Sequence, residues 1–385
     1  MPVREHDLGE IRDAVAKLCA AFPMDYWREA DRERRYPTEF VAALTRAGWL
    51  SCLIPEEYGG AGLPLAAAAA ILEEIQKSGA NGAACHAQMY TMGTVLRHCS
   101  EAQKRKYLPK LASGELRLQA FGVTEPSAGT DTSSIRTTAV KKGDRWVVNG
   151  QKVWTSRAEH SDLMLLLART APREEARRTE GMSVFIVDMK AALGRGLAIR
   201  PIRTMINHAT TEVFFENLEI PAGNLVGEEG KGFRYIIDGM NAERILIGAE
   251  CIGDARWFLG KATAYANERK VFGRPIGQNQ GVQFPIARAH MAAEAAALMV
   301  ERAAALYDEG RPCGPEANMA KQLAAEASWQ AGDTCLQTHG GFGFAEEYDI
   351  ERKFRETRLY QIAPISTNLV LCYIAEHVLH LPRSY

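Results

Sequence analysis

The local pattern of this sequence changes twice along its length, and that order of patterns most restricts the fold. Residues 1–119 favour helix, residues 120–225 read as short strands, and residues 226–385 favour helix again. A doubly wound α/β fold would need strands and helices to alternate along the chain. We therefore predict a mainly α-helical protein with a central β domain, divided at these boundaries.

The helical regions are recognised by their composition. Residues 65–78 and 102–112 are rich in Ala or other helix-forming residues and poor in β-branched ones, which favours helix. Two later runs, residues 232–269 and 283–309, are long and rich in Ala, Leu and Met. Helices of that length usually lie side by side in a bundle.

The central region is predicted to be strands because its apolar segments are short and bounded by turn signals. The segments are residues 145–148, 162–168, 182–187 and 212–215. The turn signals include residues 142–144 and the Asn149-Gly150 pair. The charged residues 172–180 are predicted to form a solvated loop.

Composition excludes several classes of protein. The 46 basic and 47 acidic residues give a net charge of −1, which argues against a nucleic-acid-binding surface. No apolar stretch approaches the roughly 20 residues of a membrane span, and the charged start lacks the apolar region of a secretory signal. The eight cysteines include no C-x-x-C pair, so we expect buried thiols in a reducing, cytoplasmic compartment.

Several familiar motifs are absent. The sequence has no G-x-G-x-x-G, no phosphate-binding P-loop, no H-E-x-x-H and no G-x-S-x-G. His377 and His380 are too few to form a metal site, so no metal is predicted.

Two segments carry a positive signal. Residues 121–131, FGVTEPSAGTD, are dense in small residues and hydroxyls, which suits close approach to a flat polar ligand. Residues 149–156, NGQKVWTS, place an indole beside two hydroxyls. Together they could supply an aromatic wall and several donors for a heteroaromatic cofactor. Taken alone, the first could be a turn-rich connection and the second a hairpin with a core tryptophan.

In combination these segments resemble the acyl-CoA dehydrogenase family of flavoproteins. Residues 268–276, ERKVFGRPI, resemble the family's E-R-x-x-F-G-x-x-I, and residues 337–343, QTHGGFG, resemble its Q-x-x-G-G-x-G. The resemblance covers essentially the whole chain. It implies a helical domain, a β-barrel-like domain and a C-terminal four-helix bundle.

The resemblance also implies FAD, bound by residues carried over from the motifs. One wall of the flavin site would be formed by Phe121, Val123, Thr124, Gly129 and Thr130, and the other by Trp154, Thr155 and Ser156. A neighbouring subunit of a homo-oligomer, expected to be a tetramer, would supply Arg269, Phe272, Gln280, Gln337, Gly340 and Gly341. Ser366 and Asn368 are also assigned to the cofactor, and Thr130, Asn241, Arg244 and Ile365 to the substrate.

The catalytic base of the family is a carboxylate that removes a proton from Cα of an acyl thioester. The position used by many members reads Pro364 here, whereas isovaleryl-CoA and long-chain types use the position of Glu243. Glu243 is the only charge on an apolar helical stripe that includes Met240 and Ile247, with Arg244 expected to face elsewhere. The alternatives are a Glu243 paired to a cation of another helix, and Glu250 as the base.

Pro364 also lacks the backbone N–H that would hold the thioester oxygen. Either the N–H of Ile365 replaces it, or the chemistry differs. The resemblance therefore implies an acyl-CoA dehydrogenase that passes electrons to an electron-transfer flavoprotein. The alternatives are a flavin monooxygenase, an enoyl-CoA reductase, or a non-catalytic homologue that binds acyl-CoA or FAD. His339 would have a structural role in the first case.

Overall fold

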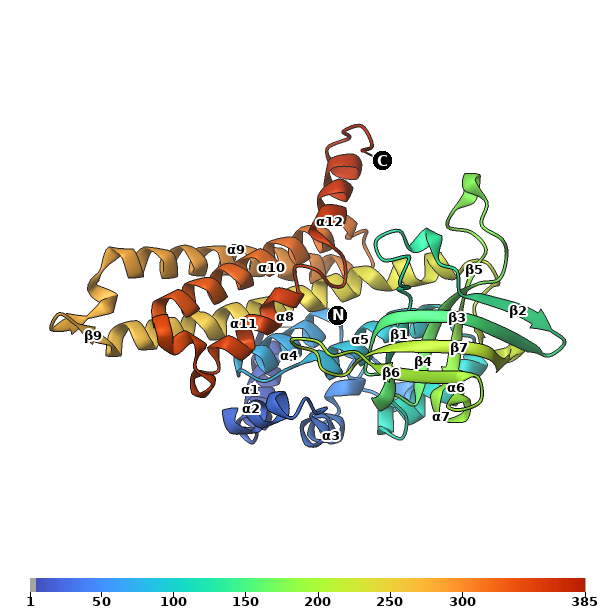
Figure 1. Ribbon diagram of the computed structural model, residues 1–385, viewed down its shortest axis with the longest axis horizontal. Coiled ribbons are helices and arrows are strands. Elements are labelled where there is room, and N and C mark those ends of the chain that lie inside the picture. The colour runs from blue at the N-terminus through green and yellow to red at the C-terminus, as the bar shows by residue number, and fades with distance from the viewer. Residues whose placement is uncertain (1–4, 385) are drawn as a thin grey trace. The chain divides into compact units, whose positions relative to one another are not determined.

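The computed structural model describes residues 5–384, and its helices fall in two groups along the chain (Figure 1). Those before the strands are α1 (Glu5–Ala20), α2 (Met24–Arg32), α3 (Thr38–Arg46), α4 (Leu65–Lys77), α5 (Ala83–His98) and α6 (Glu101–Ser113). A single turn, α7 (Met189–Ala192), lies among the strands. Those after the strands are α8 (Gly232–Glu268), α9 (Gln280–Asp308), α10 (Gly314–His339), α11 (Ile350–Leu359) and α12 (Thr367–Tyr373).

The strands occupy the middle of the chain, as the sequence pattern predicts. They are β1 (Leu118–Gly122), β2 (Thr138–Lys142), β3 (Arg145–Ser156), β4 (Leu163–Arg169), β5 (Met182–Asp188), β6 (Leu197–Pro201), β7 (Thr210–Pro221) and β8 (Leu225–Val226). A small hairpin of β9 (Lys270–Val271) and β10 (Arg274–Pro275) separates α8 from α9. The fold is therefore helical, then β, then helical.

The chain forms two compact units, each assembled from separate stretches of sequence. The first contains the described residues of Met1–Glu33 together with Pro64–Gly82 and Asn241–Tyr385. The second contains Arg34–Leu63 and Ala83–Met240. The predicted domain boundaries at residues 119 and 225 remain a prediction, and each unit is described below by itself.

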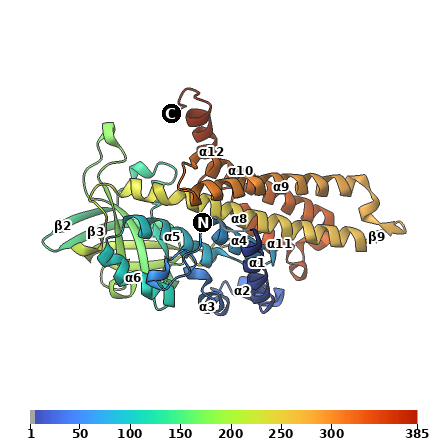
Figure 2. The same ribbon diagram turned by 180° about the vertical axis from the view of Figure 1, so that it is seen from behind.

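The second unit is built on one sheet with the strand order β6-β7-β3-β2-β4-β5-β8. The pairs are antiparallel except that β1 and β2 run parallel to β4. Every residue of β4 is buried, because alternate side chains enter two different cores. Leu163 and Leu165 pack with residues of α5 and α6, whereas Met164 and Leu166 pack with Trp146 and other residues of the opposite face. Figure 2 shows the unit from the α6 side.

One turn prediction in this unit is wrong. Asn149-Gly150 does not end a strand, because β3 continues from Arg145 to Ser156. The pairing of β3 with β7 instead shifts register between Val148 and Gly150. Gly150 has a φ of 146°, and a Cβ placed on it would lie 2.5 Å from the Thr137 hydroxyl oxygen. The glycine therefore permits a bulge and a close backbone approach inside a long strand.

The first unit is a helical bundle in which small residues form the contact between the longest helices. The helices α9 and α10 pack side by side (Figure 1), and α4 packs on α9. Their buried faces are mostly alanine, for example Ala289, Ala293, Ala320 and Ala324. Side chains this small allow close approach of helix backbones. Within residues 5–384, no helix is both long and apolar enough to cross a bilayer.

This bundle also buries charges. The ammonium of Lys353, which is fully buried, lies 2.5 Å from a carboxylate oxygen of Asp254 and 3.1 Å from Glu356. It also donates to Gln76 Oε1 at 2.9 Å. Burial raises the pKa of Asp254 to about 7, against the opposing effect of Lys353. The cluster ties α8 and α11 to α4.

Candidate functional site

The segment after β1 is fixed by a buried ion pair. Lys152 is fully buried, and its Nζ donates to the backbone oxygen of Val123 at 2.9 Å and to Glu125 Oε1 at 2.8 Å. Glu125 also accepts hydrogen bonds from the backbone N–H groups of Arg136 and Thr137. The carboxylate is therefore fully engaged, and the chain from 123 to 125 has a defined path.

The second cofactor segment lies directly beside the first, since Val153 N–H donates to the Thr124 carbonyl at 2.9 Å. Trp154 is the next residue, and its φ of 60° is an outlier for a bulky side chain. It coincides with a register shift in the β3–β7 pairing between Lys152 and Thr155. The indole is 58% exposed, so the alternative of a core tryptophan is wrong. Strained backbone of this kind clusters at ligand sites.

Two donors in these segments have no partner. The Thr155 side chain is 1% exposed, yet its hydroxyl has no hydrogen-bond partner among residues 5–384. The backbone N–H of Thr124 likewise has no protein acceptor within the described chain. Native structures seldom leave buried hydroxyls unpaired. The unpaired Thr155 hydroxyl and Thr124 N–H suit the polar edge of a flavin, and the exposed Trp154 indole suits its face.

The remaining predicted cofactor residues of the second unit differ in exposure and in whether they are already hydrogen-bonded. Ser156 Oγ already accepts from Asn207 Nδ2 at 2.8 Å. Phe121 is half-buried and packs edge-on against Tyr90, with ring centroids 5.6 Å apart. Gly129 and Thr130 are exposed, and a Cβ added to Gly129 would meet nothing within 4 Å. The structure thus places these residues in one loop and one strand end of the second unit.

Glu243 lies on α8 in the first unit. Its side chain is 8% exposed, and no hydrogen bond or ion pair involves it among residues 5–384. Burial raises the pKa of Glu243 from 4.5 to about 7, and the Arg244 guanidinium partly opposes this shift. Arg244 therefore influences the charge of Glu243, although no hydrogen bond or ion pair joins the two side chains within residues 5–384. That Arg244 faces elsewhere stays a prediction. The interpretation of Glu243 as a partner in an ion pair finds no support in the described contacts.

The Arg244 side chain is also buried, and only some of its hydrogen-bond donors have partners. Its Nη1 donates to Asn241 Oδ1 at 2.9 Å, while its Nε has no partner within residues 5–384. Burial lowers the pKa of this guanidinium, and Glu243 opposes the effect. The arginine is thus held in place by Asn241 and retains donor capacity beside the candidate base.

The segment around Pro364 offers a replacement donor. The ammonium of the fully buried Lys321 holds the Ile365 carbonyl at 2.8 Å. No acceptor for the Ile365 N–H exists within the described residues. Ser366 caps α12 by accepting from Leu369 N–H, while Asn368 is exposed. The N–H that Pro364 lacks is therefore available one residue later.

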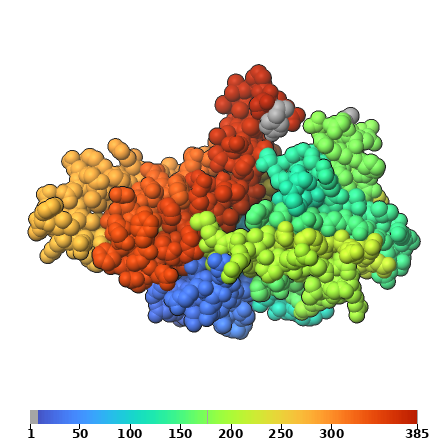
Figure 3. Space-filling model, in the orientation of Figure 1, coloured from blue at the N-terminus to red at the C-terminus, as the bar shows by residue number. Residues whose placement is uncertain are grey.

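A third group of predicted residues lies at the far end of the bundle. There His339, at the end of α10, stacks on Tyr265 of α8 with ring centroids 4.1 Å apart. Its Nδ1 donates to the Cys335 carbonyl at 2.8 Å, which supports a structural role. The predicted cofactor residues of this group are all exposed: Arg269, Phe272, Gln280, Gln337, Gly340 and Gly341. Phe272 is fully exposed at the tip of the β9–β10 hairpin, the end of the bundle seen at the left of Figure 3.

This third group does not meet Glu243 within one chain. Glu243 and Tyr265 lie on the same continuous helix, and at 1.5 Å per residue they are about 33 Å apart. A single isoalloxazine ring cannot contact both. Among residues 5–384 there is also no cluster of three or more metal-ligating side chains.

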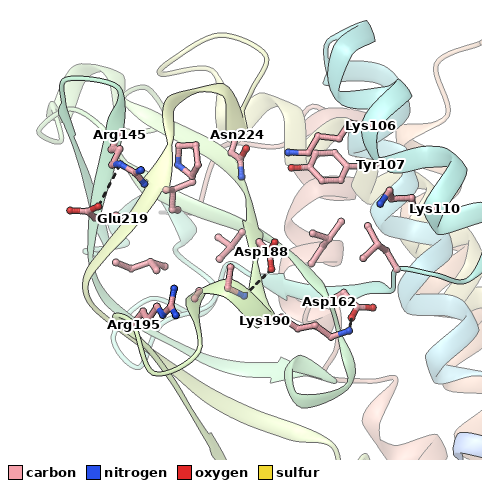
Figure 4. Close-up of a pocket in the computed structure, with 18 of the residues that line it drawn as sticks. Lys106, Tyr107, Lys110, Arg145, Asp162, Asp188, Lys190, Arg195, Glu219 and Asn224 are labelled. Atoms are coloured by element: carbon pink, nitrogen blue, oxygen red, sulfur yellow. Dashed lines mark hydrogen bonds and ion pairs between the residues drawn. The ribbon is translucent and has the colours of Figure 1, made fainter.

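A cavity of about 1040 Å³ opens elsewhere in the second unit (Figure 4). It contains none of the predicted site residues. Two pairs of its charged side chains are engaged with one another, Lys190 with Asp162 at 2.5 Å and Arg145 with Glu219 at 3.6 Å. Asp188 caps α7. The cavity is therefore not the predicted flavin site.

Two functional candidates were missed by the sequence reasoning, Lys152 and Lys321. Each is a fully buried ammonium that holds a carbonyl of a predicted site segment. Neither lysine offered a local signal. Lys152 lies between Gln151 and Val153 in β3, and its partner Val123 is 29 residues away in the chain. The partner of Lys321 lies 44 residues away.

Comparison with known proteins places these features in context. Models for the N-terminal, middle and C-terminal domains of acyl-CoA dehydrogenases match residues 5–115, 120–218 and 230–379. The chain is 35% identical to acyl-CoA dehydrogenase fadE12 of Mycobacterium bovis over 389 aligned residues, which cover 100% of this chain and 98% of that protein.

Solved structures agree. A glutaryl-coenzyme A dehydrogenase in complex with glutaryl-CoA matches with a TM-score of 0.91 and 32% identity over 100% of this chain and 98% of that one. A structure from work on the electron transferring flavoprotein of Acidaminococcus fermentans matches with a TM-score of 0.91 and 30% identity over 98% and 99% of the two chains. An FAD complex of PigA, at 24% identity, a TM-score of 0.91 and 98% coverage of both chains, shares the fold. This chain therefore belongs to the acyl-CoA dehydrogenase family, as an FAD-dependent oxidoreductase that acts on CH–CH bonds of acyl-CoA.

Proposed function

We propose that the protein converts an acyl-CoA thioester to its trans-2-enoyl-CoA, with Glu243 as the base that removes the Cα proton. The observation that carries this proposal is a buried carboxylate with no ion-pair partner among residues 5–384 and a pKa raised to about 7. General bases work best when their pKa lies near the operating pH. Desolvation is also what keeps such a carboxylate basic enough to attack a weak carbon acid.

The residues of the second unit would hold the cofactor. FAD, when bound, supplies the acceptor for the hydride that leaves Cβ. The Thr155 hydroxyl and the Thr124 N–H are donors with no protein acceptor in the described chain, and Trp154 presents its indole beside them. Phe121, Val123, Gly129, Thr130 and Ser156 complete the proposed set.

The thioester would be oriented by the first unit. Removing the Cα proton places negative charge on the thioester oxygen, and a backbone N–H stabilises such charge by about 2.7–4 kcal/mol. The Ile365 N–H can serve because it has no protein acceptor within the described residues, and Lys321 fixes the chain beside it by holding the carbonyl of the next peptide. Asn241, Arg244 and Thr130 are the remaining substrate contacts in this proposal. The position of the base favours a branched or medium-to-long acyl group.

We further propose a homo-oligomer, a tetramer by family resemblance. The exposed residues at the far end of the bundle cannot reach the Glu243 site of their own chain, so a second copy would supply them. Phe284, Met291 and Leu298 of α9 support this, because they recur every seven residues and are 49%, 71% and 67% exposed. Such a stripe is typical of a helix that packs against a partner.

An electron-transfer flavoprotein is the proposed electron acceptor. The support is family membership, together with the structural match from work on such a protein. The seven buried cysteines among residues 5–384 agree with the proposed cytoplasmic location.

The test is anaerobic titration of the FAD-loaded protein with a panel of acyl-CoA thioesters, followed by the flavin absorbance. Bleaching by a saturated acyl-CoA, with formation of the enoyl-CoA, is the expected result. Bleaching by none of them, with oxidation of the reduced protein by an enoyl-CoA, would indicate a reductase. Rapid consumption of O₂ by the reduced protein would indicate a monooxygenase, and no reaction in any assay a non-catalytic homologue.

A further inference from the structure

The pair of Lys152 and Glu125 is more than the fold requires. Both side chains are buried, at 0% and 5% exposure, and their charged atoms lie 2.8 Å apart. A buried ion pair commonly stabilises a protein no more than apolar residues of the same volume would. Glu125 additionally has two backbone donors of its own, from Arg136 and Thr137. The second contact of the ammonium, with the Val123 carbonyl, points to another role.

The contact between Lys152 and the Val123 carbonyl fixes one peptide plane. The peptide between Val123 and Thr124 is trans and planar, so its carbonyl and its N–H point in opposite directions. Lys152 Nζ holds the carbonyl of this peptide at 2.9 Å, and Val153 N–H holds the next carbonyl, that of Thr124, at 2.9 Å. Two successive carbonyls are thus bound by two successive residues of β3. The free Thr124 N–H is consequently directed away from Lys152 with little freedom to rotate.

The ammonium also changes the strength of this donor. A charged donor on a carbonyl polarises the peptide, and linked hydrogen bonds strengthen one another by about 10–30% per bond. Burial lowers the pKa of Lys152 to about 8, and Glu125 opposes the shift. The lysine therefore remains mostly protonated at pH 7. An N–H polarised in this way binds best to an acceptor that carries the most negative charge.

We propose that Lys152 is a positioning residue for the flavin, which fixes and polarises the Thr124 N–H so that the FAD is bound more tightly and is more easily reduced. This inference rests on the proposed location of FAD beside Thr124. Reduction adds electrons to the isoalloxazine ring, so a stronger donor stabilises the reduced form more than the oxidised one. Lys152 acts through the peptide and does not touch the cofactor itself.

The test compares Lys152→Met with the wild type, both loaded with FAD. The dissociation constant of FAD, from quenching of flavin fluorescence, should rise about tenfold, because the Thr124 N–H is no longer oriented and polarised for its hydrogen bond to the flavin. The midpoint potential, from equilibration with a reference dye during reduction without acyl-CoA, should move to more negative values. Lys142→Met removes an exposed lysine at the β2–β3 turn and should leave both quantities unchanged.

A structural role alone would weaken FAD binding without moving the potential, so an unchanged potential in Lys152→Met overturns the proposal. Lys152→Arg retains the charge and should restore the potential toward the wild-type value. If Lys152→Met does not fold, Lys152→Gln, a neutral donor, is compared with Lys152→Arg, and equal potentials in the two overturn the proposal. These measurements use no acyl-CoA. Failure of the proposed reaction is detected in the separate titration, in which no acyl-CoA would bleach the flavin of the wild type.

Discussion

The burial of Glu243 should cost the protein stability, and Glu243→Gln measures that cost. A pKa raised from 4.5 in the unfolded chain to about 7 in the folded protein corresponds to about 3 kcal/mol, since one pKa unit is worth 1.36 kcal/mol. The folded protein binds this proton more tightly than the unfolded chain does. The stability that comes from the bound proton of Glu243 is therefore fully present below pH 4.5 and is lost as the pH rises through 7.

Glutamine has nearly the same shape and never ionises. The free energy of unfolding of Glu243→Gln is compared with that of the wild type at each pH. We expect this difference, variant minus wild type, to be about 2–3 kcal/mol larger at pH 8 than at pH 5. Asp254 also titrates with a raised pKa, but it is present in both proteins and cancels in the difference. The assay is urea unfolding of the FAD-free proteins, followed by tryptophan fluorescence at both pH values.

The matched control is Glu301→Gln, which changes an exposed carboxylate of α9. It should show no dependence on pH relative to the wild type. The reasoning is refuted if the difference between Glu243→Gln and the wild type is the same at pH 5 and pH 8. That result would mean that Glu243 ionises as it does in water and is not poised as a base.

Three further changes test other parts of the account. Arg244→Met removes the cation that opposes the effect of burial on the pKa of Glu243. The pH midpoint of flavin bleaching by acyl-CoA should therefore move above 7. A midpoint that stays the same or falls would contradict the influence of Arg244 on Glu243. Thr155→Val removes a buried hydroxyl with no protein partner in residues 5–384. Urea unfolding should show that the FAD-free variant is as stable as the wild type or about 1 kcal/mol more stable. Fluorescence titration should show weaker FAD binding. An unaltered FAD affinity would mean that Thr155 is not part of the site. Leu298→Lys places a charge in the exposed stripe of α9, so sedimentation should detect smaller assemblies with less bound FAD, unless the stripe faces solvent in the native assembly.

The order of helices and strands could be predicted because it depends on local composition. The apolar segments at 162–168 and 182–187 became β4, displaced by one residue, and β5, which extends one residue further. Asn149-Gly150 was misread because the same dipeptide suits both a hairpin turn and a bulge. The contact of Gly150 with Thr137, which decides between them, is visible only in the folded chain.

The candidate site could be predicted where its signal lies within one element. The isolation of Glu243 on an apolar stripe is a property of one helix, and its burial follows. The supporting contacts join distant parts of the chain, as Lys152 does with Val123 and Lys321 with Ile365. Long-range pairings of this kind have no local pattern to reveal them. The influence of Arg244 on Glu243 was likewise missed, because both side chains are buried where α8 has no solvent-facing side.

The role of Glu243 as the base is tested most directly by rapid anaerobic mixing of the FAD-loaded protein with the most effective acyl-CoA of the panel. The wild type should bleach, and the rate should rise with pH through about 7. Glu243→Gln should retain FAD and bind the thioester, yet show no bleaching on the same time scale. Undiminished bleaching in Glu243→Gln would contradict the assignment, and the proton acceptor would then have to be sought elsewhere, with Glu250 the first candidate.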